Sequence, residues 1–367
     1  MLQKLDLPSS QLLIWVFIPY RMKEQKLISE FYDNATYRQE LKDVFAELGL
    51  AWKWQPITLE NMEAVVEEVA SANSELIPIV LNYCDGYEEI DGYPSTGAVA
   101  KLLQAKGIIF TGADAATAYL CDNKILTKQT LIQAGVATAA YEVISDISSI
   151  RGIRDRLGTP LIVKPAKSYA AYGISLKSVV YNDEQAIAQV ERLVQGEHER
   201  QFSLNNIFIE QFINGPEFTV FLLGSAQQPD QIKIYPPVER VLHSSLPDHE
   251  RFLSFERYWR KYEEETPLSA EEPFYRFQLA GDSLDQQLRD LSRRAYCAVG
   301  GNGYARVDIR MDKATQQLFV LEINVNCGIS NSDELSVTNI LAISGITFAE
   351  LMAEIIAEAL TKKSTYC

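Results

Sequence analysis

The sequence predicts an α/β protein whose first part is a parallel sheet covered by helices and whose later part contains antiparallel hairpins. Strand-like apolar runs alternate with helical patterns over about the first 110 residues, as in a covered parallel sheet. Farther along, residues 306–310 and 318–324 alternate polar and apolar side chains around a polar turn, which is the pattern of a β-hairpin. A chain of 367 residues can bury a sizeable core and accommodates two or three structural units.

The first unit is expected to begin with a fully buried strand at residues 11–18. Helices are then expected at 37–48, 61–71 and 99–104, and strands at 76–81 and 107–112. The dinucleotide-binding pattern Gly-x-Gly-x-x-Gly does not follow the first strand, and the sequence contains no Walker A motif. If the protein binds a nucleotide, it must therefore do so through a different motif.

Composition and charge exclude several classes of function. The net charge of −15 argues against a nucleic-acid surface, which needs clustered Lys and Arg. No apolar run reaches the roughly 18 residues that a membrane-spanning helix requires. The five cysteines are widely spaced and the three histidines offer no zinc spacing, so we expect no disulfides and a reducing, cytoplasmic location.

The densest chemistry lies in the hairpin around residues 304–330. Side chains two apart share a face of a strand, and a hairpin folded about residue 315 places Asp308 opposite Glu322, with Asn324 on the same face. Two carboxylates and an amide oxygen suit Mg²⁺, and Arg306 on that face could stabilise developing negative charge. The alternative is a solvated outer face with a surface ion pair. Gly328 is expected to permit a sharp turn beside this face.

Two lysines of the middle segment are candidates for phosphate binding. Lys164 ends an apolar strand at 160–165, where a buried ammonium needs an anionic partner, and the small-residue loop that follows lets backbone N–H groups approach phosphate oxygens. Lys128 stands in the middle of a helix expected from Cys121 to near Gly135, where the alternative is an ordinary surface lysine.

Two acidic residues flank a predicted hairpin with strands at 207–210 and 217–223. These residues are Glu210 and Glu217, and the alternative interpretation makes them protective charges on edge strands. Residues 245–279 resemble a long loop, which in compact enzymes often forms a lid. Amphipathic and apolar patterns predict helices at 283–299 and 348–360.

Asp85 and Glu89 follow the buried strand at 76–81. Ligands of open α/β sheets bind outside the carboxyl ends of strands, so these two residues are candidates for lining the pocket of the first substrate. Ordinary loop polarity is the alternative.

Together, the order of these motifs resembles that of the ATP-grasp ligases, and within them the D-alanine–D-alanine ligase group. The run Glu210-Gln-Phe-Ile-Asn-Gly-Pro-Glu217-Phe-Thr-Val is similar to that family's adenine and ribose hinge almost residue for residue. The resemblance covers roughly residues 80–360. It implies an α/β ATP-grasp fold in which an N-terminal parallel α/β domain (1–118) precedes central (119–205) and C-terminal (206–367) α+β domains that clasp ATP. It also implies a homodimer.

The resemblance assigns a role to each matching residue. Lys128 and Lys164 hold the ATP phosphates, and the loop at 168–173, with Ser168, Ala170 and Gly173, closes over them. Adenine and ribose contact Glu210, the backbone of Phe212 and Ile213, and Glu217. Mg²⁺, with Mn²⁺ as an alternative, is bound by Asp308, Glu322 and Asn324. The tetrahedral intermediate is stabilised by Arg306 and the N–H of Gly328, with Lys164 as a further catalytic residue. In the 245–279 loop, Lys261 is a candidate for closing on ATP, together with Tyr258 and Tyr262.

The implied activity is a carboxylate–amine ligase that forms an amide through an acyl-phosphate. Its partners are a small-molecule carboxylate and an amine. Where the family has Gly-Ser-Ser in the phosphate loop, this chain has Tyr169-Ala170-Ala171, and acidic residues follow Ser332 near the expected acceptor site. These departures from the family's pattern favour a ligase of secondary metabolism, for example one of mycosporine-type or dipeptide synthesis. The alternatives are a cell-wall D-alanine–D-alanine ligase, a non-catalytic nucleotide-binding protein, and an enzyme that only phosphorylates the carboxylate.

Overall fold

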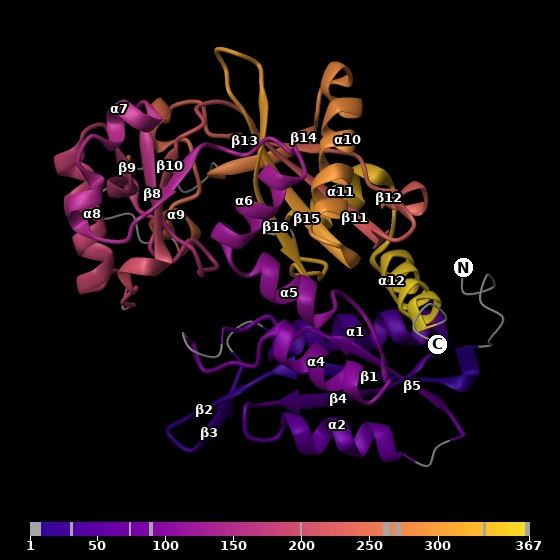
Figure 1. Ribbon diagram of the computed structural model, residues 1–367. Helices are drawn as coiled ribbons and strands as arrows, with labels where there is room; N and C mark the ends of the chain where they lie inside the picture. Colours follow the sequence, from indigo (N-terminus) through magenta and orange to yellow (C-terminus); the bar gives the residue numbers. More distant parts are fainter. Residues whose placement is uncertain are drawn as a thin grey trace.

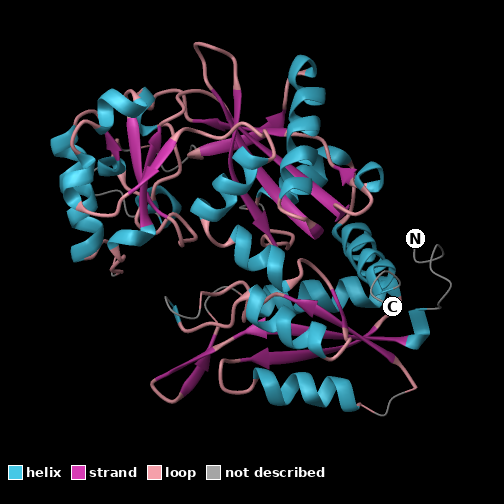
Figure 2. Ribbon diagram, in the orientation of Figure 1, coloured by secondary structure: helices cyan, strands magenta, loops and turns pink. Residues whose placement is uncertain are grey.

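The computed structural model describes residues 9–29, 32–72, 75–87, 91–198, 200–259, 265–266, 268, 273–332 and 335–363. Within these residues the strands form a four-stranded parallel sheet, a four-stranded antiparallel sheet, a larger antiparallel sheet and a small two-stranded ribbon (Figures 1 and 2). The predicted order, a parallel sheet first and antiparallel sheets later, is confirmed.

The N-terminal sheet is parallel and is covered on both faces. Its strands, in spatial order, are β4 (Ala51–Ile57), β1 (Leu12–Pro19), β5 (Ile77–Asn82) and β6 (Ile109–Phe110). Successive side chains of β1 point to opposite faces. Leu12, Ile14 and Val16 join one buried cluster, while Trp15 and Phe17 join another. The second cluster packs under α2 (Met62–Ser71) and α4 (Thr96–Ala105).

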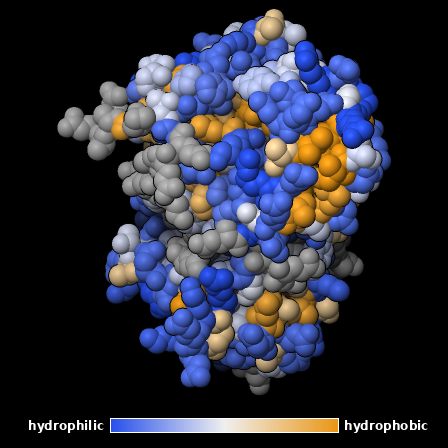
Figure 3. Space-filling model, turned by 90° about the vertical axis from the view of Figure 1, so that its left-hand side faces the viewer, coloured by the Kyte–Doolittle hydropathy of each residue, from blue (hydrophilic) through white to orange (hydrophobic). Residues whose placement is uncertain are grey.

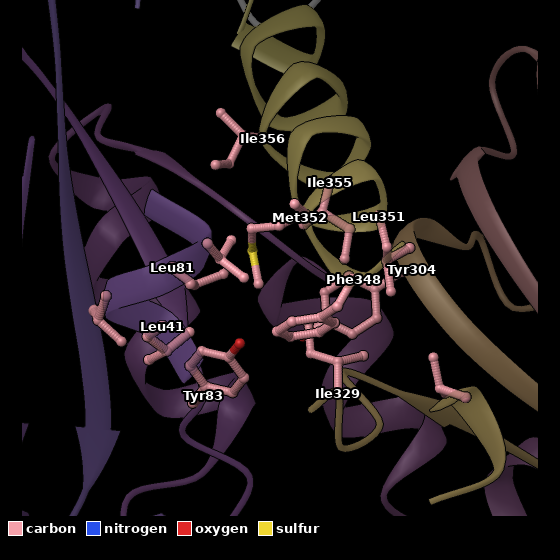
Figure 4. Close-up of a cluster of buried hydrophobic side chains, with 14 of the residues drawn as sticks. Leu41, Leu81, Tyr83, Tyr304, Ile329, Phe348, Leu351, Met352, Ile355 and Ile356 are labelled. Carbon is pink, nitrogen blue, oxygen red and sulfur yellow. The ribbon is translucent and has the colours of Figure 1, made fainter. Parts of the chain in front are cut away.

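The first cluster is closed by helices from both ends of the chain. These are α1 (Ala35–Leu48) and α12 (Phe348–Lys363). Figure 4 shows Phe348, Met352 and Ile356 of α12 beside Leu41 of α1 and Leu81 of β5. The N-terminal sheet therefore depends on α12 for part of one of its two layers. A short ribbon, β2 (Arg21–Lys23) with β3 (Lys26–Ile28), projects from this unit (Figure 1).

The central sheet is antiparallel and has the order β7 (Tyr141–Val143), β10 (Ile207–Gln211), β8 (Leu161–Pro165) and β9 (Val179–Val180). Helices α7 (Ile153–Leu157) and α8 (Asp183–Gln195) pack against it. The helix expected from Cys121 to near Gly135 is α6 (Lys124–Gln133), and a separate helix, α5 (Ala115–Cys121), precedes it. The Asn123 side chain accepts a hydrogen bond from the Ile125 N–H at 3.0 Å, which starts the second helix.

The C-terminal sheet is the largest, and its main path is β14 (Tyr275–Leu279), β13 (Val238–Leu242), β11 (Glu217–Ser225), β15 (Asn302–Met311) and β16 (Leu318–Val325). Strand β12 (Lys233–Ile234) pairs with β11 off this path. Helix α10 (Asp282–Ala298) buries Leu288, Leu291 and Ala295 against this sheet, as its amphipathic pattern predicts. Helix α11 (Ser336–Ser344) precedes α12. Short 3₁₀ helices lie at Ser9–Gln11, Ile147–Ile150, Leu176–Ser178, Leu204–Asn206, Pro229–Gln231 and Asp248–Glu250.

Two expectations from the sequence are wrong. Strands 207–211 and 217–225 do not form a hairpin, because β10 pairs with β7 and β8 while β11 pairs with β12, β13 and β15. Segment 212–216 is therefore a link between two sheets. The predicted loop at 245–279 includes helix α9 (Phe255–Trp259) and ends in an edge strand, β14. Strand β14 reads Tyr-Arg-Phe-Gln-Leu, and this apolar–polar alternation was the available signal for a strand.

The face shown in Figure 3 is largely hydrophilic, and its hydrophobic residues gather in separate patches. Among the described residues, no single helix is long and apolar enough to cross a membrane. Helices α11 and α12 meet the criteria of length and composition only as a pair, and that pair is bent by 105°.

Candidate active site

The β15–β16 hairpin presents the predicted metal-binding face. Asp308 lies opposite Glu322, and Arg306 lies opposite Asn324, so the pairing expected from the sequence is confirmed. The register shifts after Asp308, and this irregularity places Leu321 as an extra residue on β16. Such bulges re-aim the side chains beside them.

Arg306 and Asp308 form a two-pronged ion pair. The Arg306 Nε lies 3.1 Å from both carboxylate oxygens of Asp308, and its Nη2 lies 2.9 Å from Oδ2. Asp308 is buried, and its Oδ1 also accepts a hydrogen bond from the Thr219 hydroxyl at 2.9 Å. Asp308 is thus held by Arg306 of its own strand and by Thr219 of the adjoining strand β11, and the interpretation as a solvated outer face is wrong.

The two opposed carboxylates differ in their electrostatic environment. Burial raises the pKa of Asp308, although the Arg306 guanidinium partly offsets that effect. Burial also acts on Glu322, but Lys124 and Arg306 outweigh it and lower the pKa of Glu322 to about 2. The Lys124 Nζ lies 3.5 Å from Glu322 Oε2. Glu322 is therefore ionised throughout the neutral range.

The turn after β16 is made by Asn326 rather than by glycine. Asn326 has a φ of 50°, whereas Gly328 is not among the residues with positive φ. The Asn326 side-chain oxygen accepts a hydrogen bond from the Ala113 N–H at 2.7 Å. Asn adopts the left-handed region more readily than most residues that carry a Cβ. The expectation that Gly328 makes the turn is wrong. The C-terminal hairpin is thereby tied to the N-terminal unit.

Glu210 joins the two predicted phosphate lysines. Its Oε2 lies 2.6 Å from the Lys128 Nζ and its Oε1 lies 2.7 Å from the Lys164 Nζ. Glu210 and Lys128 are buried, while Lys164 keeps 19% of its side chain exposed. Lys128 is therefore not a surface lysine, and only Lys164 offers its ammonium to solvent.

Glu217 is held by two arginines. Arg240 binds one carboxylate oxygen, and the Arg310 Nε lies 3.1 Å from the other. Strand β11 lies between β13 and β15, so Glu217, like Glu210 on β10, is not on an edge strand. The edge-strand interpretation of both glutamates is wrong. Burial opposes ionisation of Glu217, but the two arginines outweigh it and lower its pKa.

The 212–216 link includes Phe212 and Ile213, whose backbone groups were predicted to contact adenine. The Phe212 N–H donates to the Pro160 carbonyl at 3.0 Å, and the Ile213 carbonyl accepts from the Arg310 Nη1 at 3.1 Å. Within the described part of the chain, the Ile213 N–H has no hydrogen-bond partner. An amide donor beside a buried carbonyl-rich link suits the acceptor nitrogens of a purine.

The predicted phosphate loop is shaped by aromatic side chains. Ala170 and Ala171 have φ of 47° and 59°, where a residue with a Cβ is uncommon. The Tyr169 ring stacks on that of Tyr87 from the N-terminal unit, with centroids 5.3 Å apart and planes 8° apart. The Trp259 indole N–H donates to the Ala170 carbonyl at 3.3 Å. The loop is thus contacted by the N-terminal unit and by helix α9.

The far end of this loop is held by a histidine. The Gly173 N–H donates to the Nδ1 of His198 at 3.2 Å. The other ring nitrogen of His198 lies 2.9 Å from Glu256. Because Nδ1 accepts from an N–H, the ring proton lies on Nε2 and is donated to that carboxylate.

Sequence reasoning assigned no role to three cations that organise this region. They are Lys124, Arg240 and Arg310. Lys124 also donates to the Ser168 carbonyl at 2.9 Å, so it joins the loop to the hairpin. Its position one helical turn before Lys128 was the available signal. Lys261 lies outside the described residues, and Gly328 lies beyond the Asn326 turn, with Leu335 as its nearest side chain.

A sequence model of the family described as "D-ala D-ala ligase C-terminus" matches residues 130–357. The chain belongs to the D-alanine–D-alanine ligase family. The D-alanine–D-alanine ligase of Bordetella petrii is 29% identical over 301 residues, which are 82% of this chain and 80% of that protein. The enzyme of the same name from Ectopseudomonas mendocina is 27% identical over 264 residues, which are 72% of this chain and 73% of that protein.

Solved structures carry the same fold. A crystal structure of D-alanine–D-alanine ligase from Bacillus anthracis complexed with ATP covers 97% of this chain and 99% of that chain, with a TM-score of 0.66 and 18% identity. The enzyme from Coxiella burnetii gives a TM-score of 0.62 at 16% identity, over 97% of each chain. The ATP-grasp fold expected from the motifs is confirmed, and the chain is an ATP-dependent, ADP-forming amide ligase of the D-alanine–D-alanine ligase family.

The residues of the β15–β16 face fit a magnesium ion that keeps part of its own shell. Within the described residues no group of three His, Cys, Asp or Glu gathers around one point, so this face offers two carboxylates and one amide. Mg²⁺ commonly binds one or two carboxylates and completes its shell with water and phosphate oxygens. The Asn324 amide nitrogen, however, donates to Asp308 at 3.0 Å, so its oxygen would have to rotate inward to become a ligand.

Proposed function

We propose that this chain is a D-alanine–D-alanine ligase, which joins two molecules of D-alanine and converts ATP to ADP and phosphate. The observation that carries the proposal is the similarity to curated enzymes of that name along 82% of this chain and 80% of the relative. It favours the cell-wall alternative over the secondary-metabolism reaction that the departures in the loop predict.

In the proposed reaction, the carboxylate of the first D-alanine attacks the γ-phosphorus of ATP. The bond to ADP breaks and an acyl-phosphate forms. The amine of the second D-alanine then attacks the carbonyl carbon, a C–N bond forms, and phosphate leaves. Positioning and electrostatic stabilisation account for most of the catalysis of such transfers. A mechanism of this kind is compatible with the observed site, which has paired cations and no nucleophilic side chain among its described residues.

The roles of individual residues follow from their placement. Lys164, partly exposed and fixed by Glu210, would contact the phosphates together with the 168–173 loop. The Ile213 N–H would donate to adenine, and Glu217 would contact the ribose while still paired with its arginines. Asp308, Glu322 and Asn324 would hold magnesium, which when bound neutralises phosphate charge. Arg306 would then share Asp308 with the metal and direct its free donors at the reacting oxygens.

A second candidate function is amide synthesis on a different amine or carboxylate. The specific observation in its favour is the Tyr169–Tyr87 stack, which places an aromatic side chain of the N-terminal unit against a phosphate loop that departs from the family's Gly-Ser-Ser. The class of chemistry is the same in both cases. Only the identity of the substrates differs.

The test is phosphate release from ATP and Mg²⁺ with D-alanine, with the product identified by mass. We expect phosphate and D-alanyl-D-alanine in equal amounts, and no dipeptide from L-alanine. Phosphate release with another amine–carboxylate pair, but none with D-alanine, would overturn the proposal and favour the second candidate. Arg306→Ala serves as the control for a contaminating ATPase.

A further inference from the structure

The phosphate loop at 168–173 ends in a buried N–H group that is held by a side chain from outside the loop. Gly173 is buried, and its N–H donates to the Nδ1 of His198 at 3.2 Å. Among the described residues, this ring nitrogen is the only hydrogen-bond acceptor of that N–H. Because a buried N–H without an acceptor is costly, the conformation of this end of the loop depends on the imidazole.

The backbone of His198 is itself in an uncommon conformation. Its φ of 54° lies in the left-handed region, which residues with a Cβ adopt infrequently. The preceding residue, Glu197, accepts hydrogen bonds from the Ser175 hydroxyl at 3.0 Å and from the Gln189 amide at 2.8 Å. Such a conformation persists where surrounding contacts enforce it, and residues of this kind gather at ligand-binding sites. The contacts at 197–198 therefore serve to hold the end of the loop.

The same imidazole contacts helix α9. Its ring stacks on that of Phe255, with centroids 3.8 Å apart and planes 12° apart, and its Nε2 lies 2.9 Å from Glu256. The Phe255 N–H also donates to the Ile174 carbonyl at 2.7 Å, one residue after the loop. An imidazole that donates from Nε2 keeps Nδ1 as an acceptor, so Glu256 fixes the tautomer that Gly173 needs. His198 therefore joins the end of the loop to α9.

The other end of the loop is held separately, by a lysine of the site. Lys124 donates to the Ser168 carbonyl at 2.9 Å. Between the two ends, Ala170 and Ala171 both have positive φ, a conformation that surrounding contacts have to maintain. The shape of the whole loop thus depends on the contacts at its two ends, and His198 supplies the one that lies farther from the metal-binding face.

We propose that His198 is a positioning residue for ATP: its Nδ1 holds the Gly173 N–H, and this keeps the phosphate loop and α9 in the arrangement that receives the ATP phosphates. The inference rests on the proposed contact between this loop and the phosphates, and it is independent of which carboxylate and amine are joined. Without the acceptor, ATP has to restore the arrangement when it binds, and its affinity falls by that cost.

The test compares two substitutions that separate the two ring nitrogens. In His198→Asn, the side-chain oxygen takes the place of Nδ1 and can accept from Gly173, but the contact with Glu256 is lost. In His198→Gln, the longer amide reaches the place of Nε2 and can contact Glu256, but the acceptor for Gly173 is lost. Calorimetry with ATP and Mg²⁺ measures the Kd for ATP, and phosphate release with D-alanine at saturating ATP measures kcat.

We expect the Kd for ATP to rise by about 5- to 100-fold in His198→Gln, the factor for a buried N–H left without an acceptor, and by less than about 3-fold in His198→Asn. The value of kcat should stay close to that of the wild type in both variants, because saturating ATP restores the arrangement of the loop. A residue that served only the stability of the fold would give no such difference between the two amides.

The matched control is His249→Gln, which removes an imidazole whose side chain is 55% exposed and should leave the Kd unchanged. If His198→Gln fails to fold, Glu256→Ala replaces it. An imidazole without that partner can carry its proton on Nδ1, where it no longer accepts from Gly173, so the Kd should again rise.

Two results overturn the inference. They are an unchanged Kd for ATP in the variant that lacks the acceptor, and an equal rise in His198→Asn and His198→Gln. A wild-type protein that binds ATP but makes no D-alanyl-D-alanine overturns the proposed function and leaves the inference standing. A wild-type protein that binds no ATP overturns both.

Discussion

Each of the two buried glutamates beside the 212–216 link is held by two cations, and this pairing decides what a substitution costs. Burial alone would raise the pKa of Glu210, but Lys128 and Lys164 outweigh burial and hold it below its ordinary 4.5. A carboxyl group with a lowered pKa in the folded state stabilises the fold at neutral pH. The same groups position the predicted ATP contacts, so stability and nucleotide binding share these residues.

Glu210→Gln should lower the free energy of unfolding by about 3–5 kcal/mol at neutral pH, because it leaves buried lysine unpaired. The folded-state pKa of Glu210 is lowered, so its contribution is present above pH 4.5 and is lost as the pH falls through the folded-state value. The difference in the free energy of unfolding between variant and wild type, measured with urea, should therefore become smaller below pH 4.5. The control is Glu142→Gln, because Glu142 of the neighbouring strand β7 forms a more exposed ion pair with Arg156 of α7. This variant should lower the free energy of unfolding by less than about 1 kcal/mol.

Arg306→Lys should reduce kcat by about 100- to 1000-fold, the range for loss of one transition-state donor, because lysine keeps the charge but not the fork that holds Asp308. Steady-state phosphate release at saturating ATP measures this effect. Arg293→Lys, exposed on α10, is the control. A kcat close to that of the wild type would show that charge alone suffices at this position.

At the scale of elements, the strength of the local pattern decided which parts were predictable from the sequence. The β15–β16 hairpin was predictable down to its pairing, since both strands alternate cleanly. Strand β4 was not identified, although its Trp-Lys-Trp-Gln alternation is typical of a half-buried strand; the proline near its end weakens that signal. The partition of β10 and β11 into different sheets depends on contacts with β8 and β15, which no local pattern encodes. The partners of Glu217, Arg240 and Arg310, were missed for the same reason.

Gly215→Ala should destabilise the link between the two sheets. A Cβ on Gly215 would lie 2.1 Å from the Met311 carbonyl oxygen, and backbone bonds at Pro216 and Lys313 prevent the segment from moving away. We expect a loss of about 1–3 kcal/mol in thermal unfolding, typical of overpacking, and a raised KM for ATP. Gly281→Ala, where nothing lies within 4 Å of the added atom, should change stability by less than about 1 kcal/mol. Equal effects of the two variants would argue against a steric origin.

At the scale of the whole molecule, the N-terminal and central units meet at the phosphate loop. The Tyr87–Tyr169 stack joins the N-terminal unit to this loop, and the Asn326–Ala113 hydrogen bond joins the N-terminal unit to the C-terminal hairpin. Arg200 adds a hydrogen bond to the Tyr169 hydroxyl at 2.9 Å. The position of the loop therefore depends on the placement of the N-terminal unit.

Tyr169→Ala should loosen the 168–173 loop without unfolding the protein. An aromatic pair contributes about 0.5–1.5 kcal/mol, so we expect roughly a 2- to 10-fold rise in the KM for ATP. Limited proteolysis should cut the variant faster within the loop, and ATP should slow that cut. Tyr181→Ala removes an exposed ring near the same sheet and should leave the KM and the cleavage rate unchanged. Matching behaviour of the two variants would contradict a role for the stack.

The docking of α12 on the N-terminal sheet has a consequence for synthesis on the ribosome. Phe348, Met352 and Ile356 complete a core whose other members include Leu12 and Leu41. The N-terminal unit is made before α12, so the face of its sheet that α1 and α12 share is covered by α1 alone until residues 348–363 have been made. Domains usually fold as they emerge. Here the nascent N-terminal unit is expected to need chaperone protection until α12 has emerged, and a chain released before residue 348 should aggregate.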